Sequence, residues 1–316
     1  MFHFLKLIMR SLLKRSNLFK ANSIKKDWFD SFVKGSLGLC ALISIITTFS
    51  IIFILGKETL LFFEQVPIGD FLFGTKWEPL LEPQSFGVLP LISGTFLIVI
   101  GSSLVAIPAG LLTSIYLGEY AGPRTKAIVK PILEILAGIP TVVYGYFALT
   151  VITPMLKMIF PSIEVFNALS GSIVVGIMIL PMISSLCDDA MSSLPRSLKE
   201  GGYAMGATSF EVVWSILVPT ALPRIVAAFI LAISRAIGET MAVVMAAGAT
   251  PKMTMNFLES IQTMTSYIVQ VSLGDTPAGG VEYQTCFAVG AVLFVMTLVM
   301  NIIGRKFYKR FNLEIE

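Results

Sequence analysis

The sequence predicts an all-α, polytopic membrane protein with six transmembrane helices. Of its 316 residues, 55% are hydrophobic and only 14% are charged, and the mean hydropathy is +0.83. A soluble domain cannot cover its surface with so few charged residues. A helix needs roughly 20 apolar residues to cross about 30 Å of hydrocarbon. Six stretches meet this requirement: 35–56, 89–117, 128–153, 169–187, 221–249 and 285–304.

The distribution of positive charge predicts the orientation of these helices. Eighteen of the 23 Lys and Arg residues lie before the first span, in or beside the loops that follow the second and fourth spans, or after the last span. The intervening loops hold four. Because Lys and Arg accumulate on the cytoplasmic side, both termini are expected in the cytoplasm of a multi-pass protein of the cytoplasmic (inner) membrane. The net charge of +3 then reflects topology, and no nucleic-acid partner is predicted.

The Cys and His residues do not indicate a disulfide or a metal site. Cys40, Cys187 and Cys286 lie in or at the ends of apolar segments without paired spacing, and the single His is His3. A His-ligated metal centre within the membrane is therefore excluded.

Three regions follow from these patterns. Residues 1–34 are basic, with Lys6, Arg10 and Lys14 on one helical stripe, which predicts an amphipathic helix on the inner leaflet rather than a signal peptide. Residues 35–305 form the transmembrane domain, and 306–316 a cytoplasmic tail.

Two outer loops carry apolar residues. The loop 57–88 is rich in aromatic residues and Pro, which is typical of anchors at a membrane interface. The loop 250–284 contains apolar residues at helical spacing from Phe257 to Val271, so it is expected to form one amphipathic helix.

The loop 195–219, between the fourth and fifth spans, has two predicted helices. The first, about 196–205, has a polar start, and the second runs from Ser209 to Trp214. Gly206 lies between them and suits a sharp bend, because Gly adopts backbone angles that other residues resist.

The spacing within this loop resembles the cytoplasmic "EAA" loop of ATP-binding-cassette (ABC) importer permeases, which docks a short helix onto a separate ATPase. Glu200, Gly201, Gly202 and Gly206 carry the resemblance. The small residues at 201 and 202 would let another protein approach closely. Both usual Ala positions are Gly here, which weakens helix propensity by about 1 kcal/mol per site. The alternative is a simple re-entry loop whose Gly residues only make turns.

Arg235 and Glu239 lie within the fifth apolar stretch. At a spacing of four they share one helical face and can form an ion pair. A lone Arg at the bilayer centre costs at least about 2.5 kcal/mol, so such residues face a bundle interior or a wet cavity. The forked guanidinium matches a phosphate or sulfate oxyanion. Either the pair lines a substrate pathway, or it is a permanent ion pair that fixes helix packing.

A more specific resemblance rests on four sequence runs. They are Arg235-Ala-Ile-Gly-Glu-Thr-Met-Ala-Val243, Trp77-Glu-Pro79, Phe86-Gly-Val-Leu-Pro-Leu-Ile-Ser-Gly-Thr95 and Gly138-Ile-Pro-Thr-Val-Val-Tyr-Gly145. Together they are similar to the PstC-type permease of phosphate-specific ABC importers, over about residues 35 to 305.

The resemblance implies a set of partners and assigns importance to Arg235 and Glu239. The partners are a PstA-type second permease in a heterodimer, two PstB-type ATP-binding subunits and an extracytoplasmic PstS-type phosphate-binding protein. The chain lacks a Gly-rich loop ending in Gly-Lys-Ser/Thr. It is therefore expected to hold no cofactor, and ATP and Mg²⁺ are expected on the ATPase.

The sequence thus predicts a permease subunit, not an enzyme, of an ATP-driven importer for inorganic phosphate. The alternatives within this class are a PstA-type subunit or a permease for another oxyanion, such as molybdate or sulfate. An ion-driven secondary transporter would take up substrate without an ATPase. An intramembrane protease would need a His pair, paired Asp residues within spans or a Ser–His dyad, which the sequence lacks.

Overall fold

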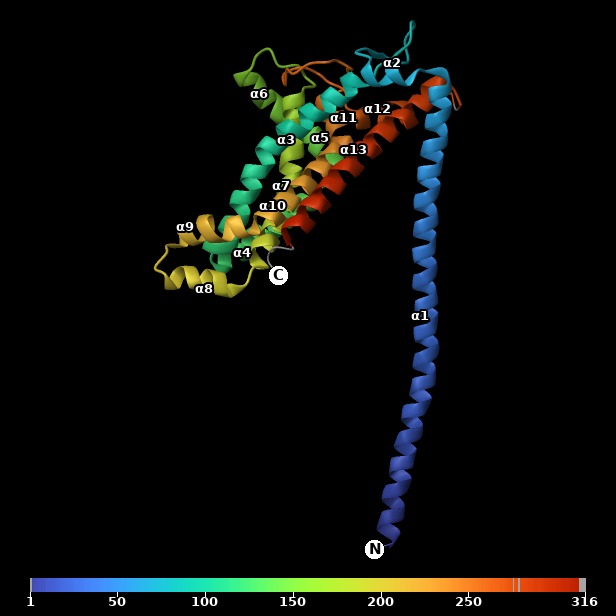
Figure 1. Cartoon of the computed structure of the whole chain (residues 1–316), viewed down its shortest axis with the longest axis vertical. Helices are drawn as coiled ribbons and strands as arrows, with labels where there is room; N and C mark the ends of the chain where they lie inside the picture. Colours follow the sequence, from blue (N-terminus) through green and yellow to red (C-terminus); the bar gives the residue numbers. More distant parts are fainter. Residues whose placement is uncertain (1, 275, 278, 313–316) are drawn as a thin grey trace. The chain divides into compact units, whose positions relative to one another are not determined.

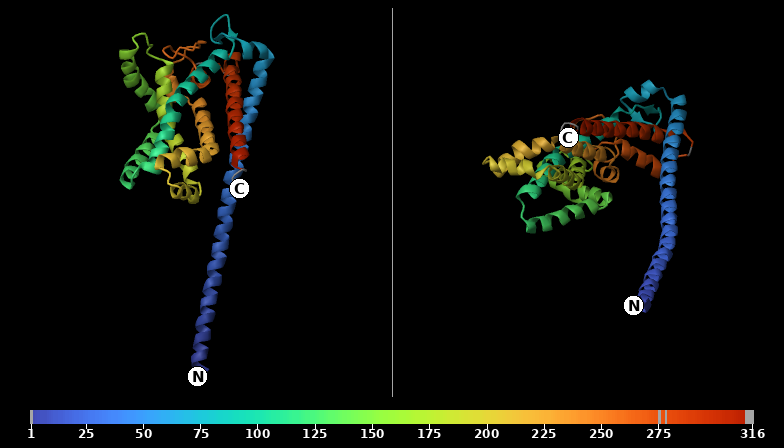
Figure 2. Two further views of the ribbon diagram at one scale, coloured as in Figure 1. Left: turned by 60° about the vertical axis from the view of Figure 1, so that its left-hand side comes forward. Right: turned by 60° about the horizontal axis from the view of Figure 1, so that its bottom comes forward.

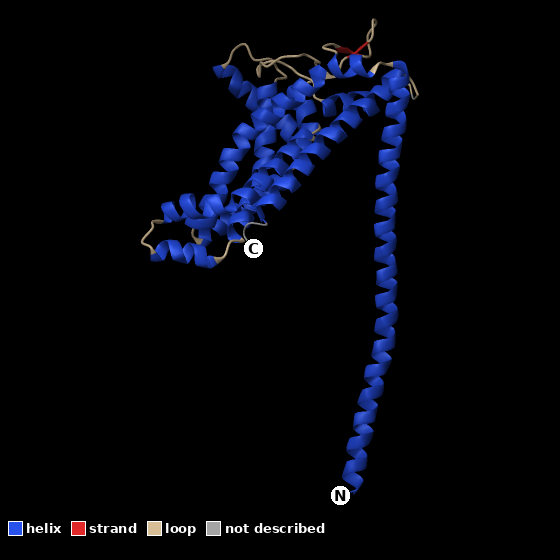
Figure 3. Ribbon diagram, in the orientation of Figure 1, coloured by secondary structure: helices blue, strands red, loops and turns tan. Residues whose placement is uncertain are grey.

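The computed structural model describes the backbone of residues 2–274, 276–277 and 279–312. It describes the side chains of residue 29 and of 31–307, apart from 275 and 278. The described chain is almost entirely helical, as Figure 3 shows. Its contacts divide it into a unit of Met1–Lys57 and a unit of Glu58–Glu316. The two units are taken separately below.

The first unit is a single helix. Helix α1 runs without a break from Phe2 to Gln65, so its last turns belong to the second unit. The portion Ser31–Gln65 is apolar and long enough to cross a membrane. The described part of the basic segment, 2–34, is helical, as predicted, and continues directly into this span. The predicted stripe of Lys6, Arg10 and Lys14 falls on side chains outside the described set.

The second unit holds the other apolar spans. Within the described residues, six helical stretches are long and apolar enough to cross a membrane, which confirms the predicted number. Five of them lie in this unit: Leu89–Tyr120, Thr141–Ile159, Ala168–Ser192, Ser209–Ile237 and Val281–Phe307. Their elements are α3 (Leu89–Ile115), η1 (Tyr116–Tyr120), α5 (Thr141–Phe147), η2 (Ala148–Ile152), α6 (Thr153–Ile159), α7 (Ala168–Ser192), α9 (Ser209–Glu211), η3 (Val212–Leu217), α10 (Val218–Ile237) and α13 (Val281–Asn312), where η denotes a π-helix.

Two spans differ from their predicted limits. The predicted third span, 128–153, is two helices, because α4 (Pro123–Gly138) ends before Pro140 and α5 begins at Thr141. Proline disfavours helical geometry in the residue before it, and Ile139 is accordingly extended. The predicted fifth span, 221–249, begins earlier and ends at Ile237. A separate helix, α11 (Met241–Ala247), follows.

The bundle has two distinct ends. Figure 1 places α4, α8 (Arg196–Ala204), α9 and the end of α13 at one end, and α2 (Ile68–Phe73), α6 and α12 (Met264–Leu273) at the other. The left view of Figure 2 keeps this grouping. The predicted loop 195–219 and the end of α13 therefore lie on the same side of the bundle.

Three rings of the aromatic loop 57–88, those of Phe62, Phe71 and Trp77, are packed inside the protein. Strand β1 (Trp77–Glu78) pairs antiparallel with β2 (Ser85–Phe86), which holds the loop in a small hairpin. Trp77 is only 2% exposed, and its ring centroid lies 4.8 Å from that of Tyr267 on α12. These rings thus form a core at this end, where the sequence predicted interfacial anchors.

The loop 250–284 holds a shorter helix than predicted. Helix α12 begins at Met264, and Phe257 and Ile261 lie on the non-helical segment before it. Lys252 forms an ion pair with Glu259 on this segment. Their hydrogen bond raises the pKa of Lys252 and, with a second hydrogen bond from Asn256, lowers the pKa of Glu259. The segment is therefore a folded surface at the α6 end.

Helices α3 and α7 form the centre of the second unit. Their contact buries Ile98 on α3 and Val175 and Ile179 on α7. The helices approach closely at Gly110, where an added Cβ would lie 2.6 Å from Cγ2 of Ile183. Protein interiors are packed too densely to absorb such an overlap without movement of the neighbours.

We therefore expect Gly110→Ala to lower the thermal stability of the protein. The overlap with Ile183 costs about 1–3 kcal/mol, which outweighs the gain of roughly 1 kcal/mol in helix propensity. Thermal unfolding in detergent measures the difference. Gly138→Ala is the matched control, because an added Cβ there meets nothing within 4 Å. Equal melting temperatures for the two variants would contradict close packing at Gly110.

Candidate functional site

The loop between α7 and α10 has the predicted form. Helix α8 follows Pro195 and ends at Ala204, and Gly206 has a φ of +83°. This left-handed conformation favours Gly and explains the bend. Thr208 then caps α9, with its side chain accepting from the Glu211 N–H and the Glu211 carboxylate accepting from the Thr208 N–H at 2.8 Å. The predicted second helix continues through η3 to Leu217.

The two adjacent glycines of α8 differ in environment. An added Cβ at Gly201 meets nothing within 4 Å, so its surface is open to another protein, as expected. Gly202 is buried, and an added Cβ there would lie 2.7 Å from Cδ1 of Ile216 and 3.0 Å from Cγ2 of Val212. The prediction that both glycines admit a partner is wrong for Gly202. Its role is to let α8 pack directly on η3.

The surface of this loop exposes large apolar side chains among polar ones. The exposed apolar side chains are Leu198, Tyr203, Met205, Phe210 and Trp214. Met205, beside the bend, is 88% exposed. Glu200, on α8, is also exposed. Apolar surface presented in this way is typical of a protein interaction site.

An ion pair ties α8 to the rest of the bundle. Lys199 pairs with Glu119 of η1, which extends α3. Helix α8 is thus held at two points, by Lys199 on η1 and by Gly202 on η3. The π-helix η3 leads directly into α10.

Arg235 lies near the end of α10 and faces a cavity of about 490 Å³. The cavity is bounded by α4, α7, η1 and α10. Its lining is Leu117, Lys130, Leu133, Glu134, Ala137, Met178, Pro181, Met182, Ser184, Ser185, Asp188, Asp189 and Arg235. Arg235 forms no ion pair or hydrogen bond with any residue that the structure describes. Its guanidinium donors therefore remain available to a ligand.

The cavity carries charges of both signs. Lys130 Nζ lies 3.1 Å from Oδ2 of Asp188, which joins α4 to α7. Glu134 and Asp189 add two further carboxylates. The Lys130–Asp188 pair and the Arg235 guanidinium thus occupy the same cavity, and the guanidinium there makes no ion pair with a residue that the structure describes.

Glu239 has a different environment from the predicted one. Helix α10 ends at Ile237, and Gly238 to Thr240 separate it from α11. Glu239 is 8% exposed, and its Oε1 accepts a hydrogen bond of 3.3 Å from the Ala242 N–H. The expectation of one continuous helical face is wrong, because the helix is interrupted between the two residues. The Glu239 carboxylate instead stabilises the first turn of α11.

The interruption is held in place from α12. The hydroxyl of Thr265 donates to the Glu239 carbonyl at 2.7 Å. That carbonyl belongs to the non-helical segment, and it needs such a partner because it is buried. Arg235 thus lies on α10 before the break, and Glu239 lies within the break, which side-chain hydrogen bonds stabilise.

A protein-family model described as "Binding-protein-dependent transport system inner membrane component" matches residues 106–313. This range contains α8, the bend at Gly206 and the Arg235 cavity. The chain belongs to this family. It is therefore a multi-pass transport subunit of the inner membrane, a permease and not an enzyme. Such a permease works with a second permease subunit, ATPase subunits and a binding protein.

Relatives of the permease span most of its length. It is 38% identical over 268 residues to "Probable ABC transporter permease protein YqgH" of Bacillus subtilis, covering 84% of this chain and 86% of the relative. It is 30% identical over 303 residues to "Phosphate transport system permease protein PstC" of Haemophilus influenzae, covering 89% of this chain and 93% of the relative. A protein of Methanocaldococcus jannaschii, "Probable phosphate transport system permease protein PstC", is 30% identical over 276 residues, covering 79% and 86%.

Solved structures of ABC importers share the fold. A chain of a bacterial ABC transporter involved in the import of alginate has a TM-score of 0.63 at 18% identity, covering 92% of the permease and 98% of that chain. A chain of the MetNI methionine ABC transporter, described in inward-facing conformations, has a TM-score of 0.54 at 18% identity, covering 71% and 94%. At these identities the likeness concerns the fold alone.

Sequence reasoning missed the residues that share the cavity with Arg235. They are Lys130, Glu134, Asp188 and Asp189, which come from two segments far apart in the sequence. The signal that could have grouped them was Pro140, which ends α4 and allows it to lie along α7. Without that turn, Lys130 and Asp188 are 58 positions apart with nothing to link them.

We expect Glu239→Ala to loosen the first turn of the permease's helix α11. Removing a side chain that accepts from a helix N-terminal N–H costs about 0.5–2 kcal/mol. Amide hydrogen exchange at residues 241–244 should therefore accelerate, while exchange in α3 stays unchanged. Glu239→Gln is the matched control, because its amide oxygen can still accept the hydrogen bond. Unchanged exchange in the Ala variant would show that the carboxylate does not hold the turn.

Proposed function

We propose that the permease is the PstC-type subunit of an ATP-driven importer that moves inorganic phosphate into the cell. The observation that carries the substrate assignment is the pair of PstC relatives from Haemophilus influenzae and Methanocaldococcus jannaschii. Each is 30% identical, and each match covers more than three quarters of both proteins. Arg235 supplies the chemistry that a phosphate pathway requires.

Arg235 acts as the cation that attracts phosphate. A guanidinium presents forked N–H donors that match two oxygens of a tetrahedral anion. In this conformation it faces the cavity lined by Lys130 and Asp188, near the end of the bundle that holds α4 and α8. With both termini and α8 in the cytoplasm, as the charge distribution predicts, this cavity belongs to the inward-facing half of the transport pathway.

Helix α8 and the Gly206 bend dock onto an ATPase subunit. ATP and Mg²⁺ bind on that subunit, and its closure displaces α8. The close contact of Gly202 with Val212 and Ile216 passes the displacement to η3 and α10. The end of α10 carries Arg235, so the loop and the anion site move together. Glu239 fixes the break at which the end of α10 can pivot against α11.

The complete importer would contain a PstA-type second permease, two PstB-type ATPases and a PstS-type binding protein. The binding protein would deliver phosphate to the α6 end, where the segment 250–263 and the hairpin β1–β2 form a folded surface. The PstA-type role and transport of sulfate or molybdate are the alternatives. Competition between phosphate and these anions for uptake separates the substrates.

Arg235→Gln should abolish phosphate uptake while leaving assembly intact. The substitution keeps hydrogen-bond donors but removes the charge that attracts the anion. Radiolabelled phosphate uptake by vesicles containing the complete complex measures the loss, which we expect to be at least about 100-fold from the loss of one charged contact of about 3 kcal/mol.

Lys157→Gln is the matched control, because it removes an exposed cation on α6 that does not line the cavity. It should retain uptake. Normal uptake by the Arg235 variant would rule out the proposed role of the guanidinium.

Gly206→Asp should uncouple ATP hydrolysis from transport. A non-Gly residue at a φ of +83° costs about 1 kcal/mol or more and shifts the bend between α8 and α9. ATPase activity and phosphate uptake, measured on the same vesicles, should give a raised ratio of ATP hydrolysed to phosphate moved. Gly122→Asp is the matched control, since Gly122 is equally open but has a φ of −70°. An unchanged ratio in the Gly206 variant would argue against docking at this bend.

A further inference from the structure

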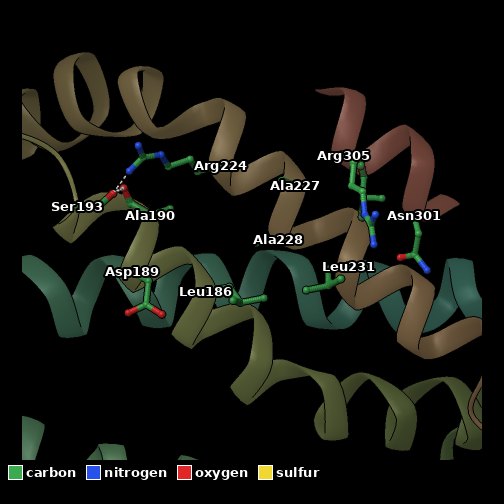
Figure 4. A pocket seen from close by; sticks show the side chains of 12 residues that line it. Leu186, Asp189, Ala190, Ser193, Arg224, Ala227, Ala228, Leu231, Asn301 and Arg305 are labelled. Atoms are coloured by element: carbon green, nitrogen blue, oxygen red, sulfur yellow. Dashed lines mark hydrogen bonds between the residues drawn. The ribbon is translucent and has the colours of Figure 1, made fainter. Parts of the chain in front are cut away.

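A second cavity, of about 640 Å³, lies between α7, α10 and α13 and is not used by the proposed transport cycle. Figure 4 shows it from close by. Arg224 of α10 lies at one end beside Ser193, to which it donates a hydrogen bond, and Arg305 of α13 lies at the other end near Asn301. Between them, Leu186 and Leu231 point toward each other.

The wall of this cavity is predominantly apolar. Besides the two leucines, its lining includes Ala227, Ala228 and Ile230 of α10 and Gly304 of α13. An added Cβ at Gly304 would lie 3.0 Å from Cγ2 of Ile230, so α10 and α13 meet there without a gap. The cavity thus has a continuous apolar wall with one guanidinium at each end. Arg305 forms no hydrogen bond or ion pair with the residues that the structure describes.

The chemistry of the cavity indicates an amphipathic, anionic ligand. Guanidinium groups bind phosphate through charge-assisted hydrogen bonds, and the apolar wall accommodates hydrocarbon. A small inorganic anion would leave that wall uncovered. The cavity contains one carboxylate, Asp189, which lies on α7 and also lines the Arg235 cavity. Among the described residues that line the cavity, two guanidiniums thus stand beside one carboxylate.

The position of the cavity supports the same ligand. It lies near the end of α13 and toward α8, the end of the bundle that carries the dense positive charge. Arg305 is followed by Lys306, Lys309 and Arg310 in the sequence. Basic pockets between transmembrane helices on the cytoplasmic side bind anionic lipid headgroups.

We propose that this cavity is a binding site for an anionic phospholipid of the inner leaflet, whose phosphate contacts Arg224 and Arg305 and whose acyl chain covers Leu186 and Leu231. The inference rests on the proposed orientation of the chain in the membrane but not on the identity of the transported anion.

The test measures lipid retained by the intact complex, containing this permease with its second permease and ATPase subunits. The complex is equilibrated with mixed micelles of equimolar phosphatidylglycerol and phosphatidylcholine at about 0.15 M salt, where exposed charges are screened beyond about 8 Å. Native mass spectrometry then counts each lipid. We expect selective retention of phosphatidylglycerol, reduced about tenfold or more in Arg305→Gln through loss of a charge-assisted hydrogen bond.

Two further variants separate the site from general attraction. Lys306→Gln removes a neighbouring cation that does not line the cavity, and it should retain the lipid. Leu231→Trp fills the apolar part without altering charge, and it should lose the lipid. Thermal unfolding of each variant in lipid-free detergent verifies that it folds.

Three results would overturn the proposal. Equal retention of the two lipids would mean that the guanidiniums do not select the headgroup. An equal loss in Lys306→Gln and Arg305→Gln would mean that only surface charge is sensed. A wild-type complex without bound lipid, with the cavity covered by another subunit in cross-linking at residue 231, would assign the cavity to a protein interface. Because the lipid count does not depend on phosphate uptake, each of the three results leaves the transport assignment to be judged separately.

Discussion

The close approach of α3 and α7 determines where the other elements of the bundle lie. Gly110 allows the two helices to meet at Ile183, and Gly176 allows a second close contact at Val105. Helices α10, α11, α4 and α5 then pack against α7, and η1 extends α3 toward α8. The contact between α3 and α7 is buried, and α7 offers its other faces to the remaining helices. Both cavities have α7 as one wall.

Two breaks in the helices place the charged residues of the Arg235 cavity around α7. The break at Gly238 separates Arg235, which faces a cavity, from Glu239, whose carboxylate accepts a hydrogen bond at the start of α11. The break at Pro140 allows α4 to lie beside α7, and this brings Lys130 to Asp188. Within lipid, such breaks persist only where neighbouring groups satisfy the freed backbone. Thr265 does this at the Glu239 carbonyl.

Much of the fold and part of the candidate site could be predicted from local sequence. Long apolar runs give the number of spans, because each hydrophobic helix must match the thickness of the hydrocarbon. The loop from Pro195 to Leu217 was also predictable, since Gly206 and the Thr208 cap act on their immediate neighbours. The limits of the third and fifth spans could not be predicted in this way. Apolar residues continue through Pro140 and Gly238, so hydropathy carries no mark of either break. The grouping of Lys130 with Asp188 follows from the turn at Pro140, which hydropathy does not mark. The inward position of Gly202 depends on packing against η3 and has no local signal.

The π-helical turn η3 has a geometric consequence for the whole of α10. A π-turn accommodates one residue more than an α-turn, and each residue of an α-helix corresponds to a rotation of about 100° about its axis. The π-helix Val212–Leu217 therefore rotates every residue of α10 about the helix axis, relative to its direction in an uninterrupted α-helix. The direction in which Arg235 projects is fixed by a local irregularity some five turns earlier, and a helical wheel drawn without that irregularity would point the guanidinium toward the wrong side of the bundle.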